Sequence, residues 1–182
     1  MNKRNVVYVG RSLDGFIADK KGGLDWLDMV PNPDNLDMGY FKFFESIDAL
    51  VMGRTTFETV CGFDCDWPYK KPVFVLSSSL KTVPEDYKDK IELVNGTLTE
   101  VLATIHGKGF GSLYIDGGKT VQSFLKEDLI DELIITTIPI LLGGGIPLFT
   151  ELPHSLEFEH VGSEVFLNEI VQNHYKRRRE PL

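Results

Sequence analysis

One stretch, residues 49–58 (ALVMGRTTFE), limits the possible fold more than any other part of the sequence. Its first four residues are all apolar, as expected of a strand that is covered on both faces of a parallel sheet. Gly53 allows a turn, after which Arg54, Thr55 and Thr56 occupy the first turn of a helix. Backbone N–H groups are free there, and the helix dipole favours anions. The stretch therefore predicts a phosphate-binding turn, and the alternative is an ordinary strand-to-helix turn with a solvated arginine.

The same order of strand, glycine turn and helix start recurs later in the chain. An apolar strand over residues 112–115 leads into Asp116 and the paired glycines Gly117 and Gly118, and a helix is expected from Val121. Adjacent glycines allow a backbone to approach a pyrophosphate or a nicotinamide closely, and the new helix start offers free donors. Together the two turns predict a nucleotide-phosphate site.

A further buried strand, residues 71–76, ends in a run of hydroxyl groups, Ser77, Ser78 and Ser79. Serines at the carboxyl end of a parallel strand can hydrogen-bond a ligand phosphate or ribose. Serine-rich turns also form for purely local reasons, so a turn that binds nothing is the alternative.

A helix is expected over residues 37–47, because apolar residues recur there at helical spacing. These apolar residues are Tyr40, Phe41, Phe44 and Ile47. Asp37 lies in the first turn of this helix, where it is either a functional carboxylate or only a capping residue.

Three other segments carry expectations of their own. The long loop over residues 19–33 is typical of a lid or binding loop, and its Trp26 is either a substrate contact or only packs the loop down. Thr97 and Glu100 have capping-box spacing and predict the start of a helix. The basic run at residues 176–179 is expected to be a solvated tail.

Composition suits an ordinary globular protein. The 182 residues, 42% hydrophobic and 25% charged, fit one domain with a real core. A net charge of −8 argues against a nucleic-acid surface, and no apolar run approaches the roughly 20 residues of a membrane span. The N-terminal apolar run is too short for a signal peptide, so a cytoplasmic protein is expected. The two cysteines, Cys61 and Cys65, and four scattered histidines predict no metal site.

The order of strands and helices predicts an α/β domain with a mostly parallel sheet. Residues 156–160, 164–167 and 170–177 alternate in polarity and are expected to form antiparallel strands at its end. Ligands of such sheets bind beyond the carboxyl ends of the strands, where both glycine turns and the serines lie.

Five motifs lie in register along nearly the whole chain. They are SLDGFIA at 12–18, VMGRTTFE at 51–58, LSS at 76–78, YIDGG at 114–118 and the segment 131–145 that ends in PILLGGG. This set resembles the dihydrofolate reductase superfamily. It is more closely similar to the reductase domain at the C-terminus of the bifunctional riboflavin-biosynthesis deaminase–reductase and to the stand-alone relatives of that domain.

The resemblance implies a single domain over residues 1–182, with a three-layer α/β/α architecture, that binds NADPH. The segment from Arg54 would hold the adenosine 2′-phosphate and the pyrophosphate, because a guanidinium pairs a doubly charged phosphate in a fixed fork. The serines would lie by the 2′-phosphate, and the segment from Gly117 would carry the pyrophosphate and nicotinamide side. The implied cofactor-binding residues are Gly10, Ile17, Ala18, Gly53, Arg54, Thr55, Thr56, Leu76, Ser77, Ser78, Ile115, Gly117, Gly118, Lys119, Thr120 and Val121.

The same resemblance implies that Asp37 is the substrate carboxylate, since it stands sixteen residues before Gly53 as in dihydrofolate reductases. Thr136 would support this carboxylate and Phe41 would pack against the substrate. Asp14 is the competing catalytic carboxylate. One departure from the family pattern is Asp116, which stands where a glycine or an apolar residue is often found before the paired glycines.

The chain is therefore expected to be an NADPH-dependent oxidoreductase of the riboflavin-biosynthesis type. It would transfer a hydride to a C=O or C=N bond of a pyrimidine- or pterin-related substrate, such as 5-amino-6-(5-phosphoribosylamino)uracil. Relatives suggest a homodimer. A dihydrofolate reductase-type enzyme is one alternative, and a nucleotide-binding protein without turnover is another, because fold and function separate readily.

Overall fold

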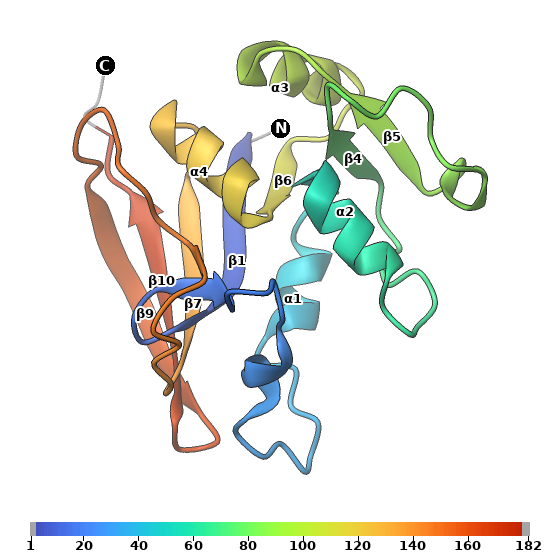
Figure 1. Cartoon of the computed structure of the whole chain (residues 1–182). Helices are drawn as coiled ribbons and strands as arrows, with labels where there is room; N and C mark the ends of the chain where they lie inside the picture. Colours follow the sequence, from blue (N-terminus) through green and yellow to red (C-terminus); the bar gives the residue numbers. More distant parts are fainter. Residues whose placement is uncertain (1–2, 180–182) are drawn as a thin grey trace.

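The computed structural model describes residues 3–179 and contains one eight-stranded sheet with helices on both faces (Figure 1). Its strands are β1 (Arg4–Ser12), β3 (Ala49–Gly53), β4 (Val73–Leu76), β5 (Ile91–Val94), β6 (Ser112–Asp116), β7 (Glu132–Ile138), β9 (Phe158–Phe166) and β10 (Ile170–Arg177). They follow the order β5-β4-β3-β6-β1-β7-β10-β9, and the first six of these run parallel. The last two are antiparallel, so the predicted mostly parallel sheet with antiparallel C-terminal strands is confirmed.

The helices form a layer on each side of this sheet. The residues of α3 (Leu98–Gly107) and α4 (Gly118–Lys126) pack on one face, and those of α1 (Tyr40–Glu45) and α2 (Arg54–Cys61) pack on the other. Strand β3 lies between the layers, and its residues Ala49 to Met52 are each 0% exposed. Ala49 and Val51 join the core under α3 and α4, whereas Leu50 and Met52 join the core under α1 and α2, as the alternation of side chains in a strand requires.

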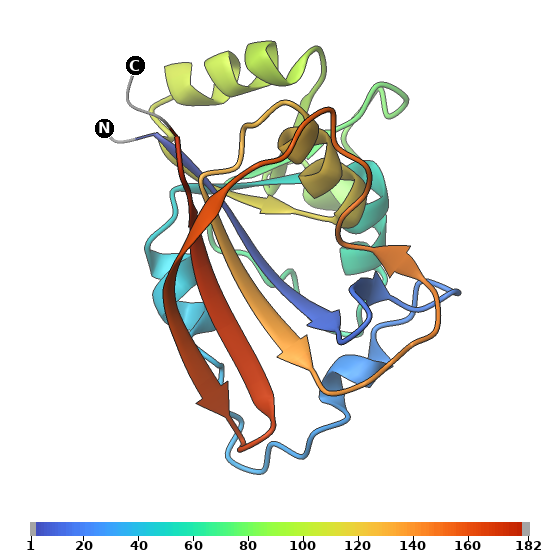
Figure 2. The same ribbon diagram turned by 90° about the vertical axis from the view of Figure 1, so that its left-hand side faces the viewer.

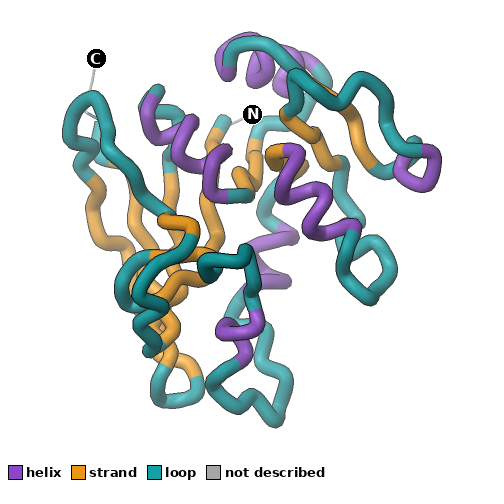
Figure 3. The backbone as a smooth tube through the Cα atoms, in the orientation of Figure 1, coloured by secondary structure: helices purple, strands orange, loops and turns teal. Residues whose placement is uncertain are grey.

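Two long connections lie outside this sheet. The first, between β1 and α1, contains β2 (Phe16–Ala18) and the short 3₁₀ helix η1 (Asp25–Asp28). The second, between β7 and β9, contains β8 (Ile146–Pro147), which pairs with β2 in a separate two-stranded sheet. Most of both connections is loop (Figure 3). A second 3₁₀ helix, η2 (Glu85–Tyr87), precedes β5. Figure 2 shows β7, β10 and β9 continuing the sheet beyond β1.

The helix expected over residues 37–47 is shorter than predicted. Met38 and Gly39 have positive φ angles (52° and 85°), which a right-handed helix does not accommodate, so α1 begins at Tyr40. The expected buried face is also wrong in one place, because Phe41 is 70% exposed and Phe43, at 7%, is buried instead.

The two strands expected at residues 156–160 and 164–167 are one continuous strand, β9. The pairing register with β10 shifts between His174 and Tyr175, which lie opposite Gly162 and His160, so Val161 is an extra residue on β9. A β-bulge of this kind inserts a residue without ending the strand, and it accounts for the break in sequence alternation.

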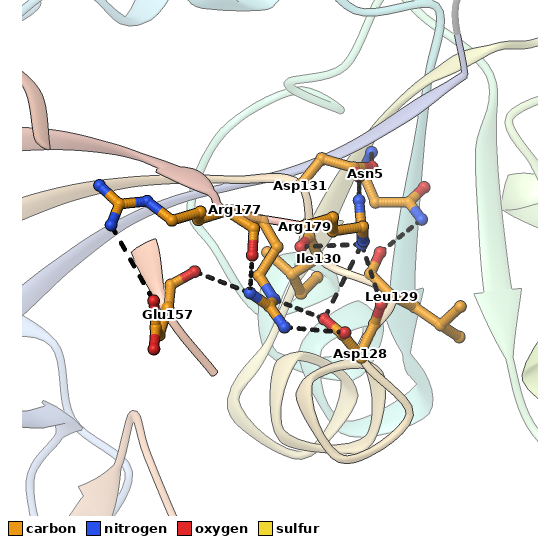
Figure 4. A network of polar contacts seen from close by, with 9 residues as sticks. Asn5, Asp128, Leu129, Ile130, Asp131, Glu157, Arg177 and Arg179 are labelled. Atoms are coloured by element: carbon orange, nitrogen blue, oxygen red, sulfur yellow. Dashed lines mark hydrogen bonds and ion pairs between the residues drawn. The ribbon is translucent and has the colours of Figure 1, made fainter. Parts of the chain in front are cut away.

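The prediction of a solvated basic tail is wrong for Arg177, whereas Arg179 is exposed and also forms an ion pair. The Arg177 guanidinium makes a two-pronged contact with Asp128 (Nε to Oδ1 2.7 Å, Nη2 to Oδ2 3.0 Å), and its side chain is only 11% exposed. Arg179 pairs with Asp131, whose other carboxylate oxygen accepts the backbone N–H of Asn5 (2.7 Å). Figure 4 shows this network, which fastens the end of β10 to the start of β1.

Candidate functional site

A cavity of about 820 Å³ opens at the carboxyl ends of β1, β3 and β6. β6 lies between β3 and β1 in the sheet. The helices that follow β3 and β6, α2 and α4, pack on opposite faces of the sheet. A crevice at the strand ends, where successive connections leave to opposite faces, is the position at which parallel sheets bind ligands.

Two glycines allow the first turns of α2 and α4 to meet at this cavity. A Cβ on Gly117 would lie 2.1 Å from Thr56 Oγ1, and a Cβ on Gly53 would lie 2.9 Å from Thr120 Oγ1. Gly53 and Gly117 are also the N-cap residues of the two helices, and neither helix start receives a side-chain cap from the described part of the chain. Two sets of free N–H groups, each at the positive end of a helix dipole, therefore lie at one cavity and favour an anion.

Arg54 and Lys119 add positive charge at these helix starts. Both side chains are exposed and line the cavity, together with Lys21 from the turn after β2. Arg54 lies 3.6 Å from Glu58 on its own helix, but both partners are about half exposed. Such a surface pair contributes little, so the guanidinium can turn to an anionic ligand at small cost.

Nearly all of the cofactor-binding residues implied by the sequence line this cavity. They are Gly10, Ile17, Ala18, Gly53, Arg54, Thr55, Thr56, Leu76, Ile115, Gly117, Gly118, Lys119, Thr120 and Val121. Ser77 and Ser78 do not line it. Ser77 Oγ instead accepts the backbone N–H groups of Leu80 (2.9 Å) and Ser79 (3.3 Å), which is the local-turn alternative.

Asp116, at the end of β6, is the one acidic residue in the described lining of the cavity, and it was not among the expected site residues. Burial raises the pKa of its carboxyl to about 6, although the N–H of Gly117 (2.8 Å from Oδ1) and the Tyr114 hydroxyl act to lower it. A carboxyl group with this pKa can hold or release a proton close to neutral pH. The available sequence signal was a carboxylate between a buried strand and paired glycines.

Four tyrosines lie in or next to the cavity wall. Tyr8, Tyr69 and Tyr114 line the cavity, and the ring of Tyr40 packs edge-on against Tyr8 with centroids 5.6 Å apart. Burial, followed by the charge of Asp116, raises the pKa of Tyr40 to about 12 and also raises the pKa of Tyr69 and Tyr114. The phenols therefore stay protonated and can donate hydrogen bonds. Aromatic walls with a few polar groups suit a planar ring. Tyr69 lies in a loop without periodicity, and the sequence gives no signal for it.

Asp37 is exposed and does not line the cavity. Its carboxylate accepts the backbone N–H groups of Phe41 (2.8 Å) and Gly39 (3.2 Å) at the start of α1, as the capping alternative requires. Asp37 still lies close enough to Tyr8 for its charge to help raise the pKa of that phenol, after the larger effect of burial.

Thr136 and Trp26 are also outside the lining. Thr136 is buried beside Gly10 on the neighbouring strand β7, and its Oγ1 accepts the amide of Gln172 (2.9 Å). The same amide donates to the hydroxyl of Tyr8 (3.1 Å), so the side chain of Thr136 is linked to the cavity wall through Gln172 and Tyr8. Trp26 is 8% exposed and packs against the end of β7 and the start of β10, as its packing alternative requires.

Asp14 does not line the cavity either. Its two carboxylate oxygens accept the backbone N–H groups of Leu142 (3.1 Å) and Gly143 (2.8 Å), and the Ser12 hydroxyl donates to one of them (2.6 Å). These contacts lower the pKa of the Asp14 carboxyl, with the Ser12 hydrogen bond as the largest cause. Neither of the two carboxylates expected to be catalytic therefore lies in the cavity wall.

Within residues 3–179, no three histidine, cysteine or carboxylate side chains come together in a way that could hold a metal ion. None of the helices in that range has the length and apolar character needed to span a membrane.

Comparison with known proteins places this architecture in a family. The model of the RibD C-terminal domain family matches residues 6–172. The uncharacterized protein YwjB of Bacillus subtilis (strain 168) is 37% identical over 180 residues, which cover 97% of this chain and 99% of YwjB. The crystal structure of a candidate riboflavin biosynthesis protein from Shewanella sp. PV-4 has a TM-score of 0.94 and 57% identity, over 97% of this chain and 99% of that one. A dihydrofolate reductase from Enterococcus faecalis, 21% identical over 97% of each chain, is similar in fold alone, with a TM-score of 0.68. The chain thus belongs to the RibD C-terminal domain family and has a dihydrofolate reductase-like fold.

Proposed function

We propose that the protein is an NADPH-dependent reductase that transfers a hydride to a C=O or C=N bond of a planar, pyrimidine- or pterin-related substrate. The observation that carries this proposal is the meeting of the α2 and α4 helix starts at one cavity, with Arg54 and Lys119 beside them. Membership of a family named for a riboflavin-biosynthesis reductase domain supports it. So does the E. faecalis dihydrofolate reductase of the same fold, which was crystallised with NADP(H).

The lining fits a dinucleotide that carries a 2′-phosphate. The cavity volume of about 820 Å³ lies within the range of known ligand pockets, about 300–1,000 Å³. Gly117 and Gly118 place no side chain of their own at its wall, where a Cβ on Gly118 would lie only 2.9 Å from Ile17 Cδ1. The fork of Arg54 suits a phosphate, and free N–H groups at both helix starts suit the pyrophosphate. NADPH, when bound, supplies the hydride.

The other parts of the reaction fall to residues of the chain. Asp116 accepts the N–H of Gly117 at Oδ1, which leaves Oδ2 as the atom that holds the proton for the reduced bond. Tyr8 and Tyr69 provide flat walls against which the substrate ring is oriented. The apolar residues Leu24, Leu27 and Leu148 also line the cavity and exclude water from it.

Binding and turnover of NADPH test the proposal directly. NADPH is titrated into the protein, and its consumption is then followed with 5-amino-6-(5-phosphoribosylamino)uracil and, separately, with dihydrofolate. Consumption with the first compound is the expected result, and consumption only with dihydrofolate would assign the folate-type reaction instead. Tight binding without consumption would favour a nucleotide-binding protein without turnover. No binding would contradict every reductase assignment.

The role of Arg54 is tested by its cofactor preference. Replacement of Arg54 by Gln removes the guanidinium from the start of α2, and we expect NADPH to bind about tenfold to a hundredfold more weakly, with little change for NADH. Lys126→Gln is the matched control, because it removes one positive charge from the last turn of α4, outside the cavity lining. Equal losses for NADPH and NADH would show that Arg54 does not recognise the 2′-phosphate.

A further inference from the structure

The loop between β7 and β8, residues 139–145, is here called the glycine strap. It is held to the turn after β1 along most of its length. Its Ile140 carbonyl accepts the N–H of Leu13 (2.8 Å), and the N–H groups of Leu142 and Gly143 both donate to the carboxylate of Asp14. Asp14 itself is an exposed residue on the surface of the turn, so core packing does not account for its presence there.

The carboxylate of Asp14 is held in place from below. Ser12 is fully buried, and its hydroxyl donates to Asp14 Oδ1 (2.6 Å) while accepting the N–H of Phe16 (2.9 Å). Oδ1 and Oδ2 then receive the two N–H groups of the strap separately. An ionised carboxylate can accept all of these bonds, whereas an asparagine would have to present its NH₂ group to one of the donors.

Beyond the bonds to Asp14, the strap runs directly into the cavity wall. Gly143, Gly144 and Gly145 all have positive φ angles, and a Cβ on Gly145 would lie 2.1 Å from the carbonyl oxygen of Ala18. The chain then enters β8, which pairs with β2, and the N–H of Leu148 donates to the Gly15 carbonyl (2.9 Å). Three consecutive residues without side chains have few contacts of their own, so the path of the strap depends on the bonds at its ends.

The β2–β8 sheet packs against the start of α4. A Cβ on Gly118 would lie 2.9 Å from Ile17 Cδ1 and 3.2 Å from Ile146 Cγ2, and both isoleucines line the cavity. The position of these two side chains therefore sets the width of the cavity beside the α4 helix start. Asp14 therefore affects the width of the cavity through the strap, although its own side chain does not line the cavity.

We infer that Asp14 is a positioning residue for the cofactor: its carboxylate fastens the glycine strap so that Ile17 and Ile146 stay against Gly118. Asp14 takes no part in proton transfer. This inference rests on the proposed NADPH-dependent function of the same cavity. It also gives a role to the second of the two carboxylates that the sequence marked as catalytic.

Asp14→Asn and Asp48→Asn form a matched pair for the test. Asp48 is likewise exposed and likewise accepts two backbone N–H groups, from Gly111 and Ser112 (2.8 Å each), but it lies at the amino end of β3, whereas the cavity lies at the carboxyl end. If loosening leaves the binding-competent wall about 10% populated, Asp14→Asn raises the NADPH dissociation constant and KM about tenfold. The kcat at saturating NADPH and its pH profile stay unchanged. Asp48→Asn lowers the melting temperature without changing the NADPH KM.

Hydrogen exchange gives a readout that does not depend on activity. The amides of Leu142 and Gly143 are expected to exchange faster in Asp14→Asn than in the wild type, and unchanged exchange would overturn the inference. A lower kcat with an unchanged NADPH KM would make Asp14 catalytic, and equal effects of Asp14→Asn and Asp48→Asn on KM would make it merely structural. Failure of the wild type to bind NADPH would overturn the proposed function and this inference with it. Wild-type binding with an unchanged dissociation constant in Asp14→Asn would overturn this inference alone.

Discussion

Asp116 carries a carboxyl group whose proton affinity depends on what covers it. At the end of β6 its pKa is raised from 3.8 to about 6 by burial, and Tyr69 and Tyr114 lie around it. Residues near in sequence could not reveal this, since Tyr69 comes from a loop more than forty positions away.

The cap made by Asp37 is different, because a carboxylate just before a helix bonds to N–H groups close to it in sequence, and the sequence already offered that alternative.

Asp116→Asn and Asp37→Asn separate the two candidates for the working carboxyl. We expect Asp116→Asn to lower kcat by about 10²-fold or more, because an amide cannot supply an acidic proton. In the wild type, kcat/KM should fall as the pH rises through about 6, where Asp116 loses its proton, and Asp116→Asn should lack that limb. Asp37→Asn should mainly weaken α1. A loss of kcat in Asp37→Asn as large as that in Asp116→Asn would return the catalytic role to Asp37.

The raised pKa of Asp116 also predicts how stability changes with pH. The folded protein holds this proton more tightly than the unfolded chain, so the stabilisation is fully present below pH 3.8 and is lost as the pH rises through about 6. The Asp116→Asn variant should not show this loss of stability with rising pH, because its amide does not titrate there. In urea unfolding, the free energy of the variant relative to the wild type should therefore rise by about 2–3 kcal/mol between about pH 4 and pH 7.

The contribution of Asp48 to stability changes with pH in the opposite direction. Backbone hydrogen bonds from Ser112 and Gly111 lower the pKa of Asp48 below 3.8, so its contribution is present at neutral pH and is lost only as the pH falls below that value. Asp48→Asn should be less stable than the wild type across the neutral range. A constant difference between Asp116→Asn and the wild type at all pH values would contradict the burial of Asp116 as the cause of its raised pKa.

At the scale of elements, local patterns located the helices and strands, while tertiary contacts and backbone conformation set several of their ends. The capping box predicted at Thr97 is present, since Glu100 Oε2 accepts the Thr97 N–H (2.8 Å) and Thr97 Oγ1 accepts the Glu100 N–H (3.3 Å). Its two partners are three residues apart, so the sequence could show it. The start of α1 depends instead on the positive φ at Met38 and Gly39, and the single strand β9 depends on a bulge opposite β10. Neither feature follows from periodicity.

Gly117, the N-cap residue of α4, is a position where a side chain would clash. Its φ is +91°, and a Cβ there would lie 2.1 Å from Thr56 Oγ1, so Gly117→Ala strains the backbone and pushes α2 away from α4. We expect a loss of about 2 kcal/mol or more in the free energy of unfolding, together with loss of NADPH binding. Gly107→Ala, at the end of α3, is the control, since a Cβ there meets nothing within 4 Å. Similar costs for the two variants would contradict the close approach of the two helices.

For the molecule as a whole, the sequence predicted that the cavity lies at the carboxyl ends of the strands, because both glycine turns follow parallel strands. It could not predict which distant loops complete the wall. Leu27 from η1, Tyr69 and Ile146 reach the cavity through the folding of the entire chain. The same holds for Arg177, whose partner Asp128 lies 49 positions earlier in the sequence.

The contact of Arg177 is tested by keeping its charge and changing its shape. Arg177→Lys loses the two-pronged contact with Asp128, and we expect the melting temperature to fall by about 2–4 °C, which corresponds to about 1 kcal/mol. Arg178→Lys is the control, because that guanidinium lies 4.0 Å from Glu157 and is 61% exposed. Its melting temperature should change by less than about 1 °C. Equal shifts in thermal unfolding would show that the Arg177 contact adds nothing beyond charge.

The network around Asp131 has a consequence for how this chain can be rebuilt. Asp131 receives the N–H of Asn5 on its side chain and the N–H of Arg177 on its carbonyl (2.7 Å each), so the first and last strands begin and finish at one corner. That corner lies at the amino ends of β1 and β7, whereas the cavity lies at the carboxyl ends of the parallel strands. A short linker could therefore join the two strands there, and a circular permutant opened at the tight turn of Leu167 and Asn168 would keep the same strand order and an intact pocket.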